Sequence, residues 1–273
     1  MKQTKISKHK YSLVVCSSDA YSDTWKPHFT LLKKYWNGIS EIPIILNTES
    51  LKFDFPELNI ISPQLFCSKS ESQTVSWSRR LRETLDKFVH TEQVIIIFDD
   101  YFLRGPVNVE KLSICSDFLF KRQHAAYITL FPPPPPYYQI EDYPWIVKRP
   151  KHAPYILNFQ VGLWQTNKLI HYLRDHESPW YFERWGSKRA RWYSDEFYGV
   201  IQLNGEPLMF DYLASKEGIS SGLWFPATKE LFDKENIDLD LSIRGVMPKN
   251  YKAPLPKRNW IKTVWNIFRS LRP

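Results

Sequence analysis

The feature that most constrains the fold is an apolar segment that ends in two adjacent acids. Val94–Phe98 is apolar throughout, Asp99 and Asp100 follow at once, and residues 101–103 are again aromatic or apolar. Such a run is typical of a central strand buried on both faces, and ligands of open α/β sheets bind where strands of this kind end. Adjacent carboxylates repel each other unless a cation or a hydroxyl satisfies them. The pair therefore predicts a ligand site, and the alternative is a solvated turn at the end of the strand.

Strand and helix patterns alternate in front of the acid pair. Short β-rich segments are followed by segments whose apolar residues recur at helical spacing, and Ser76 is positioned to cap the second of these helices. The expected elements are strands at 11–17, 42–46, 58–61 and 94–98 and helices at 25–36 and 77–89. This alternation predicts an α/β fold with a mostly parallel central sheet and helices on both of its faces.

The pattern is less regular after the acid pair. The expected elements there are helices at 109–121 and 167–174 and strands at 125–130, 155–163, 208–212 and 222–225. Five consecutive prolines at 132–136 favour a short polyproline II segment, which is stiff and extended. Within a folded chain we expect such a segment to form a rigid lip beside a cleft, and the alternative is a ligand for proline-binding modules.

The net charge of +8 is concentrated in the C-terminal tail, residues 249–273. The tail contains no acidic residue and seven basic ones: Lys249, Lys252, Lys257, Arg258, Lys262, Arg269 and Arg272. A helix from Trp260 would gather apolar side chains on one face, namely Trp260, Ile261, Val264, Trp265, Phe268 and Leu271. This amphipathic basic helix suits peripheral contact of residues 257–272 with anionic lipid. The alternative is a terminal helix that docks on the core through the same face.

The composition excludes several other classes of protein. With only 9 glycines and no glycine-rich motif, a P-loop or a dinucleotide-binding fingerprint is excluded. Three widely spaced cysteines argue against a disulfide framework or a zinc site. No apolar stretch reaches the roughly 20 residues of a membrane span, and the N-terminus lacks a secretory signal, so we expect a cytoplasmic protein. A nucleic-acid-binding protein would explain the basic tail but not the acid pair, so no nucleic-acid partner is expected.

Five motifs, taken in order, resemble the GT-A class of nucleotide-sugar-dependent glycosyltransferases, and within it the bacterial enzymes that build surface polysaccharides. They cover residues 11 to about 225: the first strand with its Ser17-Ser18-Asp19 loop, Trp77-Ser-x-Arg-Leu81, Phe98-Asp99-Asp100-Tyr101-Phe102, Gln160-Val-Gly-Leu-Trp164 and Glu177-Ser-Pro-Trp-Tyr-Phe-Glu183. The resemblance implies a GT-A-like (Rossmann-like) catalytic domain over residues 1–248, followed by the tail. Its donor half would span about 11–130 and its acceptor half about 131–248.

In the GT-A class an Asp-x-Asp motif at a strand end holds a divalent metal against the diphosphate of the sugar nucleotide. The resemblance therefore implies Mg²⁺ or Mn²⁺, which would neutralise the charge of the departing nucleoside diphosphate. This chain has Asp-Asp-Tyr, so the second acid of the motif is missing. We expect Asp100 to bind the metal and Asp99 to accept a hydroxyl of the ribose or sugar. The irregular motif leaves open a non-enzymatic assembly protein related to these enzymes.

Three further residues are expected to bind the donor. Arg79 and Arg82 lie three residues apart on a helix and share a face, and guanidinium groups bind phosphate oxygens bidentately. The alternative for these arginines is a solvated basic face. Asp19, at the end of the first strand, is placed to meet the nucleotide base or ribose.

Glu183 is the expected catalytic base. In inverting GT-A enzymes a carboxylate after the acceptor-side strand takes the proton from the attacking hydroxyl, and segment 175–183 resembles that element. The aromatic residues 180–182 would raise its pKa by desolvation. The alternative is that Glu183 only stabilises the helix, since an acid in the first turn interacts favourably with the helix dipole. Glu177 and Asp195 are rival candidates for the base.

These expectations describe an inverting glycosyltransferase of bacterial surface polysaccharide synthesis. It would move a sugar from a nucleotide-diphosphate donor to a hydroxyl of a glycan or lipid-linked glycan. The alternative enzyme is a sugar-phosphate nucleotidyltransferase, which also uses strand-end acids but normally carries a glycine-rich signature near its N-terminus, and none is present.

Overall fold

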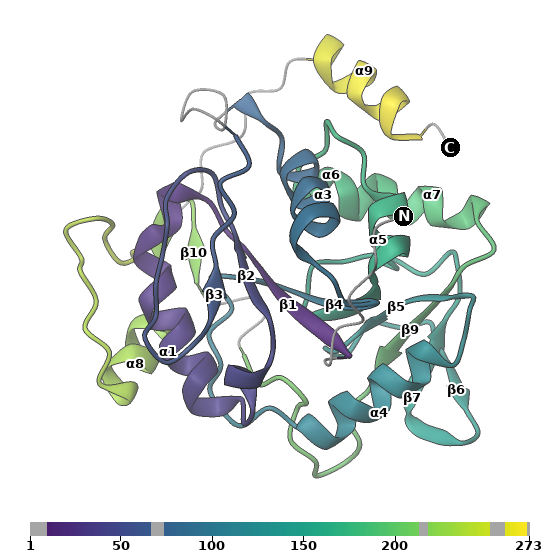
Figure 1. The fold of residues 1–273 in the computed structure, drawn as a ribbon, viewed down its shortest axis with the longest axis horizontal. Helices are drawn as coiled ribbons and strands as arrows, with labels where there is room; N and C mark the ends of the chain where they lie inside the picture. Colours follow the sequence, from purple (N-terminus) through teal and green to yellow (C-terminus); the bar gives the residue numbers. More distant parts are fainter. Residues whose placement is uncertain (1–9, 67–73, 213–217, 252–259, 272–273) are drawn as a thin grey trace.

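The computed structural model describes residues 10–66, 74–212, 218–251 and 260–271, and the side chains of the last segment from residue 264 onward. Its main feature is a nine-stranded sheet covered by helices (Figure 1). The strands of this sheet are β1 (Tyr11–Cys16), β2 (Ile44–Asn47), β3 (Ile60–Ile61), β4 (Gln93–Phe98), β5 (Ala125–Thr129), β6 (Tyr138–Ile140), β7 (Tyr143–Arg149), β8 (Gly162–Gln165) and β9 (Glu196–Val200). A separate hairpin consists of β10 (Ile219–Ser220) and β11 (Leu223–Trp224).

The helices are of two kinds, longer ones and short single turns. The longer ones are α1 (Trp25–Tyr35), α3 (Trp77–Phe88), α4 (Val109–Phe120), α5 (Thr166–Tyr172), α8 (Pro226–Glu235) and α9 (Trp260–Leu271). The turns are η1 (Asp19–Thr24), η2 (Ile39–Glu41), α6 (Pro179–Tyr181), the π-helical η3 (Phe182–Gly186), α7 (Ser187–Arg189) and η4 (Ala190–Trp192).

The sheet is mixed but mostly parallel, which confirms the predicted fold class. The strand order is β3-β2-β1-β4-β8-β5-β9-β7-β6. The pairs β3–β2, β2–β1, β1–β4 and β5–β9 are parallel, whereas β8 and β7 are antiparallel to their neighbours. Seven of the nine strands therefore point the same way, and their carboxyl ends meet at one edge.

Alternate residues of the central strands enter two different cores. Leu13 and Val15 of β1 pack with α1, α4 and α8, whereas Val14 and Cys16 pack with α3, α5 and the α6–η4 turns. Strand β4 divides in the same way, with Ile95 and Ile97 on the first face and Val94 and Ile96 on the second. Because both faces are covered, the strands are apolar without alternation, as the sequence indicated.

The connectivity places a switch point between β1 and β4. From β1 the chain proceeds to β2 and β3 on one side, and β4 then lies on the other side of β1. In open α/β sheets the crevice at such a reversal is where ligands bind. The residues that follow these strands are Ser17 after β1 and Asp99 after β4, and their side chains are in contact.

Several sequence-predicted elements differ from the structure. The strand expected at 155–163 exists only from Gly162, because residues 150–161 form turns around a positive φ of 49° at Tyr155. No strand forms at 208–212, since Met209 and Asp211 carbonyls accept instead from the loop residues Asn108 and Arg104. The strands at 58–61 and 222–225 shorten to β3 and β11. The β6–β7 hairpin, β9 and α8 were not predicted.

The two expected halves of the catalytic domain share one sheet. Strand β8 comes from the acceptor half of the sequence, yet it lies between β4 and β5 of the donor half. The predicted C-terminal helix is present as α9. Several residues noted in the sequence lie outside the described residues: Cys67, Lys252, Lys257, Arg258, Arg272 and the side chains of Trp260, Ile261 and Lys262. Among the helices that the structure describes, none has the length and apolar character needed to span a bilayer.

Candidate functional site

The acid pair lies at the carboxyl end of β4, beside the end of β1. The Asp99 carboxylate is buried, and its Oδ2 accepts hydrogen bonds from Ser17 Oγ at 2.5 Å and from Thr24 Oγ1 at 2.6 Å. Trp25 Nε1 donates to Ser17 Oγ at 2.7 Å and so fixes the position of that hydroxyl. The structure thus assigns one oxygen of Asp99 to a rigid network formed by the β1–α1 connection.

Both carboxyl groups of the pair hold protons more tightly than an exposed aspartate does. Burial and the charge of Asp100 raise the pKa of Asp99 to about 8, although the hydroxyls of Ser17 and Thr24 act to lower it. Burial also raises the pKa of Asp100 to about 6. Neighbouring buried carboxylates cannot both ionise cheaply without a cation, so the pair retains about one proton near neutral pH. Binding of a cation would release that proton.

The second acid is covered by the segment that leads into the β10–β11 hairpin. The backbone N–H of Ile219 hydrogen-bonds to Asp100, which acts to lower its pKa. Gly218 has a φ of +68°, and a Cβ at this position would lie 2.6 Å from both Cβ and the carbonyl oxygen of Asp100. The Gly218 N–H donates to Thr228 Oγ1 at 2.8 Å. Only glycine fits this conformation and this approach.

Arg244, which follows α8 in the chain, joins the C-terminal part of the protein to turn η1. Arg244 Nε and Nη2 donate to the two carboxylate oxygens of Asp23, each at 2.7 Å, and Nη2 also donates to the Ala20 carbonyl. The Arg244 guanidinium lies 4.9 Å from the ring centre of Tyr21. The bidentate pair fixes this part of the chain to turn η1, which supplies Thr24 to Asp99.

Asp19 lies at the end of β1 as predicted, but its carboxylate is already bonded within the protein. It accepts from Thr48 Oγ1 at 2.8 Å, from Ser50 Oγ at 2.6 Å and from the backbone N–H groups of Ser50 and Leu51. Although partial burial acts to raise its pKa, these hydrogen bonds lower it. Asp19 therefore orders the loop after β2, and any contact with a donor would use what remains of its exposed edge.

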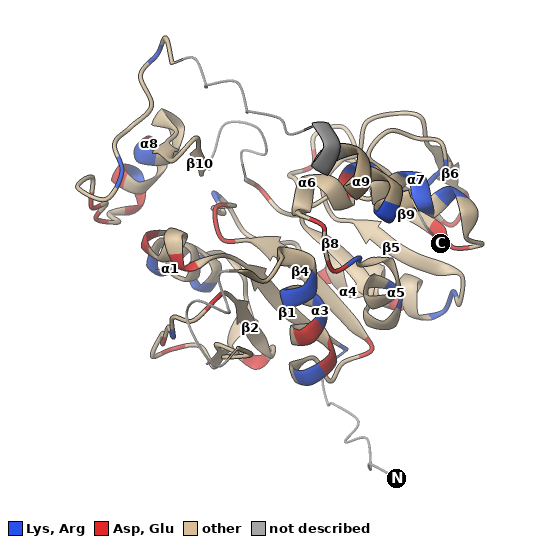
Figure 2. Ribbon diagram, turned by 90° about the horizontal axis from the view of Figure 1, so that it is seen from above, with Lys and Arg blue, Asp and Glu red and all other residues tan. Residues whose placement is uncertain are grey.

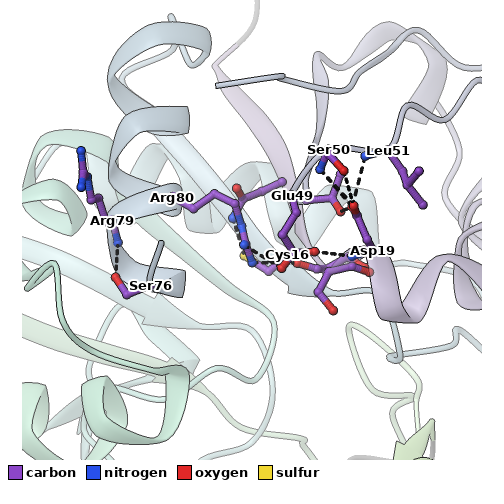
Figure 3. A network of polar contacts seen from close by, with 12 residues as sticks. Cys16, Asp19, Glu49, Ser50, Leu51, Ser76, Arg79 and Arg80 are labelled. Carbon is purple, nitrogen blue, oxygen red and sulfur yellow. Dashed lines mark hydrogen bonds and ion pairs between the residues drawn. The ribbon is translucent and has the colours of Figure 1, made fainter. Parts of the chain in front are cut away.

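The three arginines of α3 have different surroundings, and Figure 3 shows two of them, Arg79 and Arg80. Arg80 is buried, and it donates to Glu49 Oε1 at 2.7 Å and to the Ser17 carbonyl at 3.2 Å. Arg79 is exposed, and in Figure 3 its side chain extends away from Glu49. Arg82 donates to the Leu173 carbonyl and lies 2.9 Å from Asp175 Oδ1, so Arg79 and Arg82 do not form one grip.

Glu183 lies in the π-helical turn η3 and is half-buried. Its Oε1 accepts the backbone N–H of Phe159 at 2.7 Å. Burial raises its pKa, and the hydrogen bond from Phe159 opposes this change. The rings of Phe159 and Phe182 flank the turn, with centroids 5.0 Å apart. A carboxylate in such apolar surroundings is a better proton acceptor than an exposed one, as the sequence analysis expected.

The two rival bases have structural partners instead. Glu177 and Arg189 form a fully buried bidentate ion pair, with distances of 2.6 and 2.9 Å. Asp195 is also buried, and it accepts from Lys168 Nζ at 2.6 Å and from Tyr172 Oη at 2.9 Å. Both carboxylates are bonded to charged partners within the protein, whereas the contact described for Glu183 is with the backbone N–H of Phe159.

Aromatic rings connect the end of β4 with the Glu183 turn. Phe98, the residue before the acid pair, lies 5.5 Å from Phe159 between ring centroids, and Trp77 lies 4.7 Å from Phe159. On the other side, Tyr101 stacks on Tyr212 at 4.8 Å. Trp77, Phe98 and Tyr101 are partly exposed. Exposed aromatic faces of this kind can stack on sugar rings and bases.

Sequence reasoning did not select four residues at or near the site: Glu49, Arg80, Gly218 and Arg244. Glu49 follows β2, so the strand-end rule that found Asp99 could also have found it. Arg80 was noted but not chosen, since the sequence does not show the rotational phase of α3. Gly218 and Arg244 reach the site from far along the chain, and no local pattern marks either.

The residues present fit a divalent cation that is shared with phosphate. Asp100 and the second oxygen of Asp99 can supply carboxylate ligands, whereas Asp99 Oδ2 is bonded to two hydroxyls. Across the described ranges, no cluster of three or more His, Cys, Asp or Glu residues is arranged to hold a metal ion. Mg²⁺ commonly takes one or two carboxylates and completes its shell with substrate phosphates and water. Two carboxylates suit this way of binding and not a metal site in which every ligand comes from the protein.

A cavity of about 480 Å³ lies at the opposite edge of the sheet, where β4 begins. It is lined by Leu85, Glu92, Gln93, Phe120, Gln165 and Asn167, among others. None of the predicted site residues borders it, and it lacks the buried carboxylates of the other edge.

The chain matches no protein-family model and no curated protein sequence. Among solved structures it is similar to S. aureus TarS 1-349, with 13% identity and a TM-score of 0.45, over 70% of this chain and 60% of that one. The same TarS fragment in complex with UDP-GlcNAc gives 13% identity and a TM-score of 0.43, over 76% and 63%. The bifunctional glycosyltransferase WbbM, in its apo form, gives 9% identity and a TM-score of 0.35, over 70% and 35%.

This chain spans about 60% of the length of the TarS fragment. At TM-scores below 0.5 and identities of 13% or less, the likeness identifies neither a family nor an activity for this chain.

Proposed function

We propose that this protein transfers a sugar from a nucleotide-diphosphate donor to a hydroxyl of a glycan or lipid-linked glycan acceptor. The observation that carries the proposal is the acid pair at the switch point between β1 and β4, in which Asp99 is buried and Asp100 is half-buried. Carboxylates with raised pKa values at such an edge need a cation or a ligand to be satisfied, and a diphosphate with its divalent cation supplies both.

The donor would lie along the ends of β1, β2 and β4. Asp100 would hold Mg²⁺ or Mn²⁺, which would neutralise charge on the diphosphate as the bond to the sugar breaks. Asp99 was expected to accept a ribose or sugar hydroxyl; because its Oδ2 is bonded to Ser17 and Thr24, its second oxygen would be the one to bind that hydroxyl or the cation. The exposed Arg79 is free to turn toward phosphate oxygens, and Arg82 and Asp19 contribute by ordering the loops at 173–175 and 48–51. Arg80, tied to Glu49, would position the end of β1.

Glu183 would act as the general base of an inverting transfer. Its carboxylate takes the proton from the acceptor hydroxyl, the oxygen bonds to the anomeric carbon, and the nucleoside diphosphate leaves from the opposite side. Its burial supports this role, because desolvation raises its proton affinity without an ion pair to saturate it. The Phe159 N–H holds one oxygen in place and leaves the second for the acceptor.

The surrounding biology is part of the proposal. The catalytic unit would be residues 1–248, and the acceptor would belong to bacterial surface polysaccharide synthesis. A lipid-linked acceptor would bring the protein to the inner face of the cell membrane, with peripheral contact through residues 257–272. Aromatic rings at the site, such as Trp77 and Tyr101, support a sugar substrate because they offer stacking faces.

A thermal-shift screen of nucleotide sugars, with and without Mn²⁺, tests this function. A ligand that binds only the native state stabilises it by about 2.7 kcal/mol at a hundred times its Kd. We expect at least one nucleotide-diphosphate sugar to raise the Tm in Mn²⁺ and to do so less in a metal chelator. If no nucleotide sugar or nucleoside diphosphate changes the Tm, the donor site is refuted.

A further inference from the structure

Helix α9 docks on the protein through a polar strip. Ser270 is fully buried, its Oγ lies 2.9 Å from His176 Nε2, and its carbonyl accepts from Arg189 Nη1. One turn earlier, the Asn266 carbonyl lies 3.3 Å from the same His176 nitrogen. Residues four apart lie on one side of a helix, so this side of α9 is fixed to the α6–α7 region. Helix α9 also contacts η3.

The apolar side of α9 is exposed. Val264, Trp265 and Phe268 show 61%, 60% and 52% of their surface to solvent. The rings of Trp265 and Phe268 lie 6.3 Å apart and form one patch. At these three positions the stripe does not pack on the core, contrary to the sequence-based alternative, whereas Leu271 is half-buried. The described contacts that fix α9 are polar, and Val264, Trp265 and Phe268 are exposed.

A row of basic side chains lies on the neighbouring helical turns. Arg184, Lys188 and Arg191 are all exposed, and their spacing of four and three residues places them along one side of the η3–α7–η4 run. Arg184 and Lys188 lie over the Trp185 ring, at 5.2 and 4.3 Å from its centre, which supports their stems. We call Arg184, Lys188 and Arg191 the basic row.

Two exposed tryptophans stand at the ends of this row. Trp180 on α6 is 76% exposed, and Trp192 on η4 is 55% exposed. Figures 1 and 2 both show α9 beside α6 and α7, and Figure 2 shows basic residues on α9 and α7. The exposed Arg269 of α9 adds a further positive charge. The helices that carry the apolar patch and the basic row therefore lie side by side.

We propose that α9 and the basic row form one surface that binds anionic phospholipid membranes. Tryptophan and phenylalanine insert at the headgroup level of a bilayer, and nearby Lys and Arg are attracted to anionic headgroups. Only the purpose of this surface rests on the proposed function: the surface would present the site to a lipid-linked acceptor. It extends the contact beyond the tail to Trp180, Arg184, Lys188 and Arg191.

The charge of the surface selects a membrane over a second copy of the chain. A two-fold dimer through this surface would bring two basic rows into one interface, and like charges within an interface oppose association. The C-terminal tail that carries α9 contains no acidic residue that could relieve this repulsion. An anionic bilayer complements the same charges and accepts the aromatic side chains.

Vesicle flotation of the full chain tests the proposal, with phosphatidylcholine vesicles that contain either no or a large share of phosphatidylglycerol. We expect the wild type to bind the anionic vesicles, and W265S/F268S to lose at least about tenfold in partitioning. R184E and K188E should each lose about fivefold, and this loss should be smaller at high salt, which screens the charges. The matched controls are F120S on α4, an aromatic residue exposed to 64%, and K26E on α1. Both controls should bind as the wild type does.

Equal binding by wild type and W265S/F268S, or no binding of the wild type to anionic vesicles, overturns the proposal. Light scattering after size exclusion provides the other arm: a dimer that W265S/F268S converts to a monomer, without vesicle binding, would identify a self-association surface and refute the membrane. The nucleotide-sugar thermal shift of W265S/F268S should equal that of the wild type. Failure of membrane binding is therefore distinguishable from failure of the donor site.

Discussion

Gly218 lies so close to Asp100 that a Cβ at Gly218 would be 2.6 Å from the Cβ of the aspartate. This contact joins the C-terminal hairpin β10–β11 to the end of β4, where the acid pair is located. Ile219, the next residue, donates its N–H to the Asp100 carboxylate. The hairpin therefore helps to hold the second acid in position, and its glycine is required for the approach.

Gly218→Ala should disturb the acid pair more than backbone strain alone would. Gly222 provides a matched control, because its φ of +79° is similar and no atom lies within 4 Å of an added Cβ. Gly222→Ala should cost about 1–2 kcal/mol of unfolding free energy from the left-handed conformation. Gly218→Ala should cost more than this and should also weaken the nucleotide-sugar thermal shift. Equal effects of the two variants in urea denaturation would contradict the contact.

The raised pKa of Asp99 predicts a stability that falls with pH. Its folded pKa, about 8, exceeds the unfolded value, 3.8, so the native state binds more protons between these values and loses stability as pH rises. Burial lowers the pKa of His28 to about 3, which has the opposite effect below pH 6.5. The effect of His28 fades above pH 6.5, so from pH 6.5 to 8.5 the comparison of the wild type with an Asp99 variant reports on the acids.

In this window, the unfolding free energy of the metal-free wild type should decline, and that of Asp99→Asn should decline less. Chemical denaturation at pH 6.5, 7.5 and 8.5 measures both. Saturating Mn²⁺ should flatten the wild-type curve, because cation binding removes the shared proton. A wild type whose stability is constant, or rises, over the window would refute the buried protonated pair.

Glu183→Gln should prevent removal of the proton from the acceptor hydroxyl without weakening donor binding. We expect the transfer rate to fall by about 10²- to 10⁴-fold, the usual contribution of a general base. The thermal shift with nucleotide sugar should remain, because Glu183 lies on a different element from the acid pair. Glu92→Gln, an exposed acid at the other edge of the sheet, is the control and should transfer normally. Unchanged transfer by Glu183→Gln would assign the base elsewhere.

The buried pair Glu177–Arg189 should be structural. Removal of one partner leaves an uncompensated buried charge, so Arg189→Met should destabilise the protein by about 3–5 kcal/mol. Glu177→Leu combined with Arg189→Met should recover part of this loss. Because Arg189 also donates to the Ser270 carbonyl, both variants should reduce hydrogen-exchange protection of α9. A single variant as stable as the wild type would contradict the pair's structural role.

The sequence predicted the first part of the fold well because its signals there are local. Strands β1, β2 and β4 are apolar runs, and α1 and α3 have helical spacing with a Ser76 cap that accepts from Arg79 N–H at 3.2 Å. After β4 the outcome depends on distant partners. The segment 208–212 resembles a strand in sequence because it is apolar and aromatic. Phe210 and Tyr212 are buried, but the backbone of the segment bonds to the loop at 104–108.

The site was predicted only in part, and for a similar reason. Asp99 and Asp100 were found because a strand pattern immediately precedes them. Glu183 was chosen for its aromatic neighbours, of which Phe182 is buried whereas Trp180 is 76% exposed. Which arginine of α3 faces the site depends on the helix's rotation about its axis, which packing determines. The approach of Gly218 depends on tertiary structure that no short motif encodes.

The central claim is that the acid pair binds a nucleotide-sugar donor and promotes its cleavage. The most direct measurement is the release of nucleoside diphosphate from a stabilising nucleotide sugar in Mn²⁺, by the wild type and by Asp100→Asn at equal, verified folding. We predict release by the wild type and a loss of at least about a hundredfold in the variant, comparable to removal of a main electrostatic group in other active sites. Equal release by both proteins, or none by the wild type with any nucleotide sugar, would contradict the claim.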